Sequence, residues 1–267
     1  MAACIAALLS GCGGGSPASS SPTSTLSVGL IHEWIFDGNA NDSVGTLNGA
    51  VVGPITYLPA AQGYGFTGNG TTTGVNIPLS SDLQFQSSFT ISGWGNLAAL
   101  PKVEFSSLIF DGDDRAGLDP YALGVDVNGD TEFEITGAGG QNTEVMLKGT
   151  MPLNTWVLLT GTYDQTSGTM SFYQNGQIVA QQLGDTTLTP VVPLIAADNA
   201  GTGIGNGNDF GVSKSNWSWQ GSISDIRVYN RALSASEVLA LYNQGSAIRT
   251  AASAAKSLRA PVIVSPK

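Results

Sequence analysis

The stretch from Trp219 to Tyr242 reads WQGSISDIRVYNRALSASEVLALY and changes its periodicity halfway along. In its first half two sets of residues alternate, one beginning at Ile223 and the other at Ser224, and both contain apolar side chains, which predicts a β-strand contacted on both faces. Strict alternation would place the side chains of Ile223, Asp225 and Arg227 on one face of this strand. The prediction is therefore a packed strand that carries a carboxylate, and that carboxylate needs a partner elsewhere in the chain.

The second half of the stretch has helical spacing. Ser234 is followed three residues later by Glu237, which is the pattern of a capping box, where each side chain bonds the other residue's backbone N–H. Val238, Leu239 and Tyr242 then share one helical face. A closing strand that leads into one short helix is the expectation for this end of the domain.

This pattern resembles the last strand and helix of laminin-G-like domains of the concanavalin A-like lectin/glucanase superfamily, in its bacterial pentraxin-like branch. Three more stretches agree with that family in order, namely 30–45 (LIHEWIFDGNANDSVG), 89–94 (FTISGW) and 156–179 (WVLLTGTYD, then MSFYQNGQIV). The resemblance covers residues 28–243 and implies a fold that is shared by binding modules, adhesins and enzymes.

Composition agrees with an all-β protein. The 267 residues include 35 glycines, and only 11% are charged. Asn128-Gly129 and Asn175-Gly176 stand between strand-like runs and predict type I′ hairpin turns. We expect an all-β, two-sheet antiparallel jelly-roll β-sandwich, concanavalin A-like, of about a dozen strands with a short C-terminal helix.

Charge argues against nucleic acid as a partner. The formal net charge is −10, and no basic stripe crosses the predicted domain. Residues 246–267 contain four basic residues and no acidic one, and we expect them to form a weakly ordered basic tail. The predicted division is a signal peptide over 1–11, a flexible Gly/Ser/Pro linker over 12–27, the laminin-G-like domain over 28–245, and this tail.

The N-terminal residues resemble the export signal of a bacterial lipoprotein. An apolar run ends in Leu9-Ser10-Gly11-Cys12, which fits a lipobox whose cysteine is acylated. No Lys or Arg precedes the run, so the signal is incomplete and a start further upstream is one explanation. A buried apolar N-terminus with an incidental cysteine is the alternative. The lipobox predicts a lipid-anchored protein of the bacterial cell envelope, on the outer membrane facing outward or in the periplasm.

Catalysis is not expected. Glu132 and Glu134 share a strand face as a glycosidase pair might, but the superfamily's endoglucanases have a third acid where residues 137–141 here supply none. A single histidine makes no convincing Ser/His/Asp set, and His32 is expected to be a packed residue. Asp111, in FDGDDR, is interpreted as part of a solvated turn.

Ligand contact is expected at the long polar loop 198–216 and at Trp217, which follows it. Loops on a rigid sandwich carry recognition, and an aromatic ring can stack on a sugar. Trp217, Asn208 and Asp209 are therefore the predicted ligand-binding residues, while packing of Trp217 beside the core residue Trp219 is the alternative.

A structural calcium ion is the last expectation. Asp37, Asn39 and Asp42 lie within six positions on a tight turn, so their oxygens can converge. In the family this turn lies beside the closing strand, which would add Asp225. The alternative is that the turn residues only cap the turn and that Asp225 pairs with Arg227 or Arg231.

The predicted function is a non-catalytic, monomeric cell-surface binding module, with a glycan as its partner and calcium as its cofactor. A protein-adhesion or structural surface domain, with a surface protein as the partner and no small ligand, is the alternative.

Overall fold

The computed structural model describes residues 25–59, 63–111, 120–137, 141–147, 151–184, 201–207 and 217–258, with side chains in 137–147 and 251–258 left out of account. Over these ranges the chain forms fifteen strands in two antiparallel sheets, one 3₁₀ turn η2 (Ser81–Leu83) and the helix α2 (Ala235–Leu258). The predicted two-sheet antiparallel sandwich is confirmed, with more strands than the dozen expected.

The first sheet has eight strands. Its order is β13 (Gln177–Gln182), β12 (Thr169–Gln174), β11 (Trp156–Asp164), β6 (Phe89–Leu97), β15 (Gln220–Tyr229), β4 (Phe66–Asn69) and β3 (Thr56–Tyr57), and β1 (Leu30–Trp34) also pairs with β15. The second sheet has seven strands. Its order is β10 (Gln141–Leu147), β9 (Thr131–Gly137), β8 (Tyr121–Asp126), β7 (Phe105–Asp111), β14 (Thr202–Ile204), β5 (Gly74–Ile77) and β2 (Ala50–Val52).

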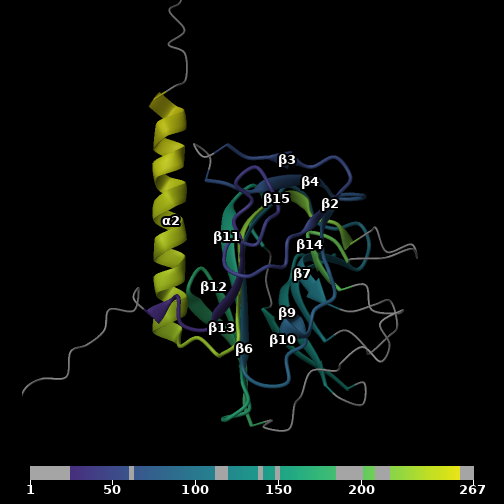
Figure 1. Cartoon of the computed structure of the whole chain (residues 1–267), viewed down its shortest axis with the longest axis vertical. Helices are drawn as coiled ribbons and strands as arrows, with labels where there is room; N and C mark the ends of the chain where they lie inside the picture. Colours follow the sequence, from purple (N-terminus) through teal and green to yellow (C-terminus); the bar gives the residue numbers. More distant parts are fainter. Residues whose placement is uncertain are drawn as a thin grey trace, which may run out of the picture.

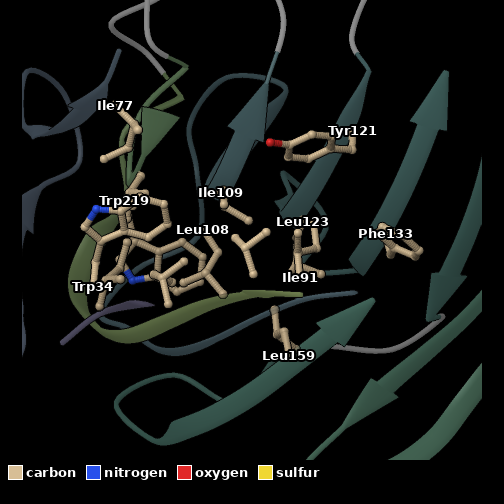
Figure 2. Close-up of a cluster of buried hydrophobic side chains, with 14 of the residues drawn as sticks. Trp34, Ile77, Ile91, Leu108, Ile109, Tyr121, Leu123, Phe133, Leu159 and Trp219 are labelled. Carbon is tan, nitrogen blue, oxygen red and sulfur yellow. The ribbon is translucent and has the colours of Figure 1, made fainter. Parts of the chain in front are cut away.

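The hydrophobic core fills the space between the two sheets. Figure 2 shows side chains from both sheets pointing toward one another, among them Leu123 and Phe133 from the seven-stranded sheet and Ile91 and Leu159 from the eight-stranded one. Trp219 is fully buried in this core, as its predicted role as a family core aromatic requires. Burial of large apolar side chains is the main source of stability in such a sandwich.

The closing strand β15 has β6 on one side and both β4 and β1 on the other. Its register to β6 shifts between Ser224 and Arg227, where Asp225 has a φ of +51°. This β-bulge changes which face later residues occupy. Ile223 and Ile226 both face the core, so the expectation that Ile223, Asp225 and Arg227 share one face is wrong.

Helix α2 covers the outer face of the eight-stranded sheet, on the side opposite the seven-stranded sheet (Figure 1). The capping box is confirmed, because Ser234 N–H donates to Glu237 Oε2 at 2.9 Å and Glu237 N–H donates to Ser234 Oγ at 3.3 Å. The predicted C-terminal helix is confirmed, and it continues to Leu258 through the segment predicted to be weakly ordered.

The contact between α2 and the sheet depends on a glycine and an arginine. A Cβ at Gly245 would lie 2.5 Å from Trp94 Nε1, so only glycine lets the helix approach this closely. One turn later the Arg249 guanidinium lies 4.2 Å from the Trp94 ring centroid and 4.6 Å from that of Trp156. In the described part of the chain, no helix is long and apolar enough to cross a membrane.

Both predicted hairpins form, since β12 pairs with β13 and β8 pairs with β9, but only the first has the predicted type I′ turn. Asn175 and Gly176 have φ values of +52° and +77°, as a type I′ turn needs. Asn128 does not have a positive φ, because β8 ends at Asp126 and its carboxylate accepts the N–H groups of Asn128 and Asp130, which makes a longer loop.

Candidate functional site

A pocket of about 200 Å³ lies on the outer face of the seven-stranded sheet, over strands β7, β8 and β9. Aromatic rings and carboxylates line it. The lining residues are Glu104, Phe105, Phe110, Ala122, Glu132, Glu134 and Trp217. Its volume is below the roughly 300–1,000 Å³ of pockets for drug-sized ligands, so it suits a ligand of about one ring.

Strand register explains how the pocket is built. Ala122 of β8 pairs with Phe110 of β7 on one side and Glu134 of β9 on the other. Neighbouring strands lie about 4.8 Å apart, so the small Ala122 side chain leaves a depression between the Phe110 ring and the Glu134 carboxylate. Gly124 is paired with Glu132, and a Cβ at this position would collide with the Phe105 ring. Small residues on β8 therefore form the floor.

Trp217 forms one wall of the pocket. Its ring meets Phe110 edge-to-face, with centroids 5.0 Å apart at 82°, and Phe105 at 5.6 Å and 72°. The residue is only partly buried, whereas Trp219, two positions later, lies in the core. Trp217 is thus packed against Phe105 and Phe110 and also lines the pocket, while its contact with a ligand stays a prediction.

Two carboxylates form the opposite wall. Glu132 and Glu134 lie on the outward face of β9, because Phe133 and Ile135 between and after them are fully buried in the core. The next outward residue is Thr136, whose hydroxyl donates to Glu134 Oε1 at 3.4 Å. Carboxylates accept hydrogen bonds from hydroxyl groups, and the aromatic wall offers an apolar surface, so the pocket can hold a polyhydroxylated ring.

A larger hollow of about 360 Å³ lies on the eight-stranded sheet beside the start of α2. Hydroxyl side chains line most of it, including Thr162, Ser167 and Ser171, and Tyr173 is its one aromatic residue among those described. Because Tyr173 is buried, with 5% of its surface exposed, this hollow offers no ring for stacking. The pocket at Trp217 is therefore the better candidate.

Asp42 is fully engaged by donors. His32 Nδ1 donates to Asp42 Oδ2 at 2.6 Å, and four backbone N–H groups, of Glu33, Val44, Gly45 and Leu47, donate at 2.9–3.1 Å. Burial raises the pKa of Asp42, but these hydrogen bonds outweigh it and the net shift is downward. Calcium needs oxygen ligands with available lone pairs, so this carboxylate does not fit the metal role predicted for it.

The other predicted calcium ligands have partners of their own. Asp37 Oδ1 accepts from Asn39 Nδ2 at 2.9 Å on the exposed turn, and Asp225 Oδ1 accepts from Arg227 Nε at 2.8 Å. Pairing of Asp225 with an arginine is the alternative to calcium binding given in the sequence analysis, and the structure shows it with Arg227. Across the described ranges, no group of three or more His, Cys, Asp or Glu could hold a metal ion, so the predicted ligand set is not assembled. Calcium binding by the protein stays a prediction.

The Arg227 side chain joins two acidic residues. Its Nε lies 2.8 Å from Asp225 Oδ1 and 2.9 Å from Glu33 Oε1, which links the bulge of β15 to β1. Burial lowers the pKa of Arg227, but the charges of Asp225 and Glu33 outweigh it, and the net shift is upward. The network therefore serves to attach β1 to the closing strand.

A second buried carboxyl lies at the end of β7. Asp111 is 2% exposed, its Oδ1 accepts from Thr202 Oγ1 at 3.1 Å, and within the described part of the chain its Oδ2 has no hydrogen-bond partner. Burial raises the pKa of Asp111 to about 7. The interpretation of Asp111 as part of a solvated turn is thus wrong, because β14 brings Thr202 over it. Asn208, Asp209 and Cys12 lie outside the described residues.

The family comparison agrees with this geometry. A laminin G family model described as the concanavalin A-like lectin/glucanases superfamily matches residues 69–239. The chain belongs to this superfamily. The match covers most of the sandwich, including the pocket strands and β15, so the resemblance stated from the four sequence stretches is confirmed for this concanavalin A-like domain. A search of curated protein sequences finds no significant match.

Solved structures of the same fold include both enzymes and binding domains. A Trypanosoma rangeli sialidase, in complex with 2,3-difluoro-KDN, is 22% identical with a TM-score of 0.59, over 84% of this chain and 34% of its own. The binding domain of botulinum neurotoxin DC, in complex with SialylT, is 15% identical with a TM-score of 0.59, over 82% and 52%. The present concanavalin A-like chain therefore spans about a third of the length of the sialidase and about half of the length of the neurotoxin chain.

Domain 4 of a Geobacillus stearothermophilus GH43 arabinanase, in complex with arabinotriose, is 20% identical with a TM-score of 0.56, over 80% of this chain and 98% of its own. At these identities the likenesses show the concanavalin A-like fold alone.

Sequence reasoning found Trp217 but not the strand residues that complete the pocket. Phe105, Phe110 and Ala122 join Trp217 only because β7 and β8 pair and the chain returns over them about 100 residues later. The sequence signal for this pocket is that Glu132 and Glu134 are alternate residues of one strand and so lie on the same face; the sequence analysis used it only to assess catalysis.

Proposed function

We propose that the protein is a non-catalytic binding module that recognises a carbohydrate unit in the pocket at Trp217. The observation that carries this proposal is the combination, in one ring-sized pocket, of a partly buried tryptophan with carboxylates that can accept hydrogen bonds from hydroxyl groups. Sugars present both an apolar ring face and hydroxyl edges, which these two walls complement.

The comparisons support binding in general terms. Among the solved structures of this fold, one is a toxin binding domain in complex with SialylT, and another is domain 4 of an arabinanase in complex with arabinotriose. The sialidase shows that the fold also occurs in a catalytic enzyme, so the fold alone does not decide the function.

The pocket favours binding over hydrolysis. Glycosidases need two carboxyl groups placed on either side of a scissile bond. Here Glu132 and Glu134 lie two residues apart on one strand, and the next outward position carries the hydroxyl of Thr136 in place of an acid.

The test is saccharide binding by the purified domain and by Trp217→Ala. Loss of a stacking platform should weaken binding by about 1–3 kcal/mol. Tyr64→Ala, which removes a ring with 41% of its surface exposed and outside the pocket, is the matched control and should bind like wild type. Saccharide binding that Trp217→Ala leaves unchanged, or release of reducing ends during incubation, would contradict the proposal. Binding to proteins only would favour the adhesion alternative.

We also propose that the module is tethered to a bacterial membrane through Cys12, with 12–27 as the linker. The tetrapeptide Leu9-Ser10-Gly11-Cys12 supports this, and Gly13 rather than Asp after the cysteine is consistent with sorting to the outer membrane. Cys12→Ser should move the protein from the membrane fraction to the soluble fraction. If the variant remains in the membrane pellet, the lipobox interpretation is wrong.

A further inference from the structure

The hollow on the eight-stranded sheet is a second place where a ligand fits. Its volume of about 360 Å³ lies within the roughly 300–1,000 Å³ that is usual for small-molecule pockets. It lies on the sheet face that α2 covers, at the end where the helix begins. Large side chains of that face, among them Trp94, Leu158 and Tyr173, fill the space under the helix. Further along β11 and β12 the side chains are small, which leaves the hollow.

Hydroxyl groups from two neighbouring strands form the floor of the hollow. Thr162 and Ser171 are direct partners across β11 and β12. Both face away from the core, because the next residues, Tyr163 and Phe172, are buried in it. The Cβ atoms of directly opposite residues lie about 4.5–5.5 Å apart, so one ring in the hollow can contact both hydroxyl groups.

Two residues that line the hollow have buried hydroxyl groups without a protein partner. Thr162 is 4% exposed and Tyr173 is 5% exposed. Within the described ranges, neither hydroxyl group makes a hydrogen bond. A buried hydroxyl group that lacks a partner costs free energy. A ligand hydroxyl group in the hollow would supply the missing hydrogen bond.

The carboxylates that line the hollow already have partners. Asp164 Oδ2 accepts from Ser167 Oγ at 2.8 Å, and Asp164 Oδ1 accepts from the N–H of Thr166 at 3.0 Å. Glu237 Oε1 lies 2.9 Å from Arg231 Nη2. The hydroxyl groups are therefore the groups that remain for a ligand.

We infer that this hollow is a second binding site, for a hydroxyl-rich ring such as a saccharide unit. Hydroxyl side chains both donate and accept hydrogen bonds, so they can pair with sugar hydroxyl groups in either direction. Ala232 and Ala235 line the helix side and offer a small apolar surface to the face of the ring. Because the ring of Tyr173 is buried, recognition here depends on hydrogen bonds and not on stacking.

The two sites lie on opposite sides of the molecule. The pocket at Trp217 is on the outer face of the seven-stranded sheet, and the hollow is on the outer face of the eight-stranded sheet beside α2 (Figure 1). The inference goes beyond the proposed function, because the hollow can bind a ligand whether or not the pocket at Trp217 does. With both sites occupied, one module bridges two saccharide chains, and this consequence alone rests on the proposed function.

The experiment measures binding by calorimetry with a panel of neutral oligosaccharides of glucose, galactose, mannose and arabinose. It compares wild type, Trp217→Ala, Thr162→Val and the double variant. Valine keeps the shape of threonine and removes the hydroxyl group. Thr162→Val should weaken the binding that remains in Trp217→Ala by about fivefold, the size expected for one hydrogen bond between uncharged groups. Ala235→Phe, at an exposed position, should fill the hollow and abolish that binding without a large change in melting temperature.

Thr56→Val is the matched control, because it makes the same change at an exposed strand position outside both sites, and it should bind like wild type. Binding that Trp217→Ala abolishes completely would overturn the second site and leave the proposed function standing. Residual binding in Trp217→Ala that Thr162→Val and Ala235→Phe both leave unchanged would also overturn the second site. Binding that only the variants of the hollow weaken would support the second site and overturn the proposed function at Trp217. Absence of binding to every saccharide in the panel would overturn both proposals.

Discussion

Replacing Asp111 by Asn should change how the stability of the domain depends on pH. In the folded protein the pKa of Asp111 is raised to about 7 from an ordinary value of 3.8, because burial disfavours the charged carboxylate. The folded state therefore holds a proton that the unfolded state releases between these two pH values. For an acid with a raised pKa, the stability contributed by the group is complete below pH 3.8, falls as pH rises, and is lost above about pH 7.

The size of the effect follows from the shift. A difference of about three pKa units, at 1.36 kcal/mol for each unit, corresponds to roughly 4 kcal/mol. Asn cannot ionise, and its Oδ1 can still accept the Thr202 hydroxyl. Its amide brings N–H groups into a site where Asp111 Oδ2 has no partner, which costs stability equally at every pH. The stability difference between Asp111→Asn and wild type should therefore move in favour of the variant, by up to about 4 kcal/mol, from pH 4 to pH 7.5.

The assay is urea unfolding followed by tryptophan fluorescence at several pH values between 4 and 7.5. Comparison with wild type at each pH cancels the contribution of the other carboxylates. Asp37→Asn, at an exposed position, is the matched control and should follow the wild-type profile. Parallel profiles for Asp111→Asn and wild type would show that Asp111 does not hold a proton in the folded state and would refute the reasoning.

Three further outcomes are expected. Asp42→Asn should lower the free energy of unfolding by about 2–4 kcal/mol in urea titrations, because one charged acceptor serves His32 and four backbone donors; unchanged stability would contradict that role. Gly245→Ala should lower the free energy of unfolding by about 1–3 kcal/mol because the added methyl group would collide with Trp94, although Ala favours helices more than Gly does. A higher free energy of unfolding in the same urea titration would contradict this, because it would mean that the helix can move away from Trp94 without cost. Thermal melting with excess calcium and with a chelator tests the predicted metal, and an equal melting temperature in both, with no metal in the purified protein, would exclude a structural calcium ion.

The sandwich could be predicted because its signals are local. The change of period after Tyr229, the capping box at Ser234 and Glu237, and the Asn175-Gly176 turn each depend on residues close in sequence. Alternation failed at Asp225 because a bulge is one extra residue in a strand, which changes parity without altering the composition of the stretch. The C-terminal helix was predicted from the capping box, but its end was not, because residues 246–258 continue the helix without a break.

The side chains of the candidate sites were harder to place. An aspartate on a tight turn can accept hydrogen bonds from N–H groups or bind a cation, and the sequence of 37–42 does not distinguish the two for Asp42. In the structure its carboxylate accepts hydrogen bonds from His32 and from the backbone of 44–47. Asp111 is buried because Thr202, from a strand 91 residues later, lies over it. The pocket at Trp217 likewise depends on strand pairing, which determines the neighbours that no local pattern records.

The position of β15 has a consequence for biosynthesis. It is the last strand to be made, yet it lies in the interior of the eight-stranded sheet, between β6 and the two N-terminal strands β1 and β4. Until residue 229 has emerged, the described strands of this sheet form three separate pieces, namely β13-β12-β11-β6, β4-β3 and the single strand β1, with unpaired edges at β6, β4 and β1. A nascent chain stalled before Trp219 should thus stay sensitive to proteases and prone to aggregation, and assembly should be a late, slow event governed by contacts between the two ends of the chain.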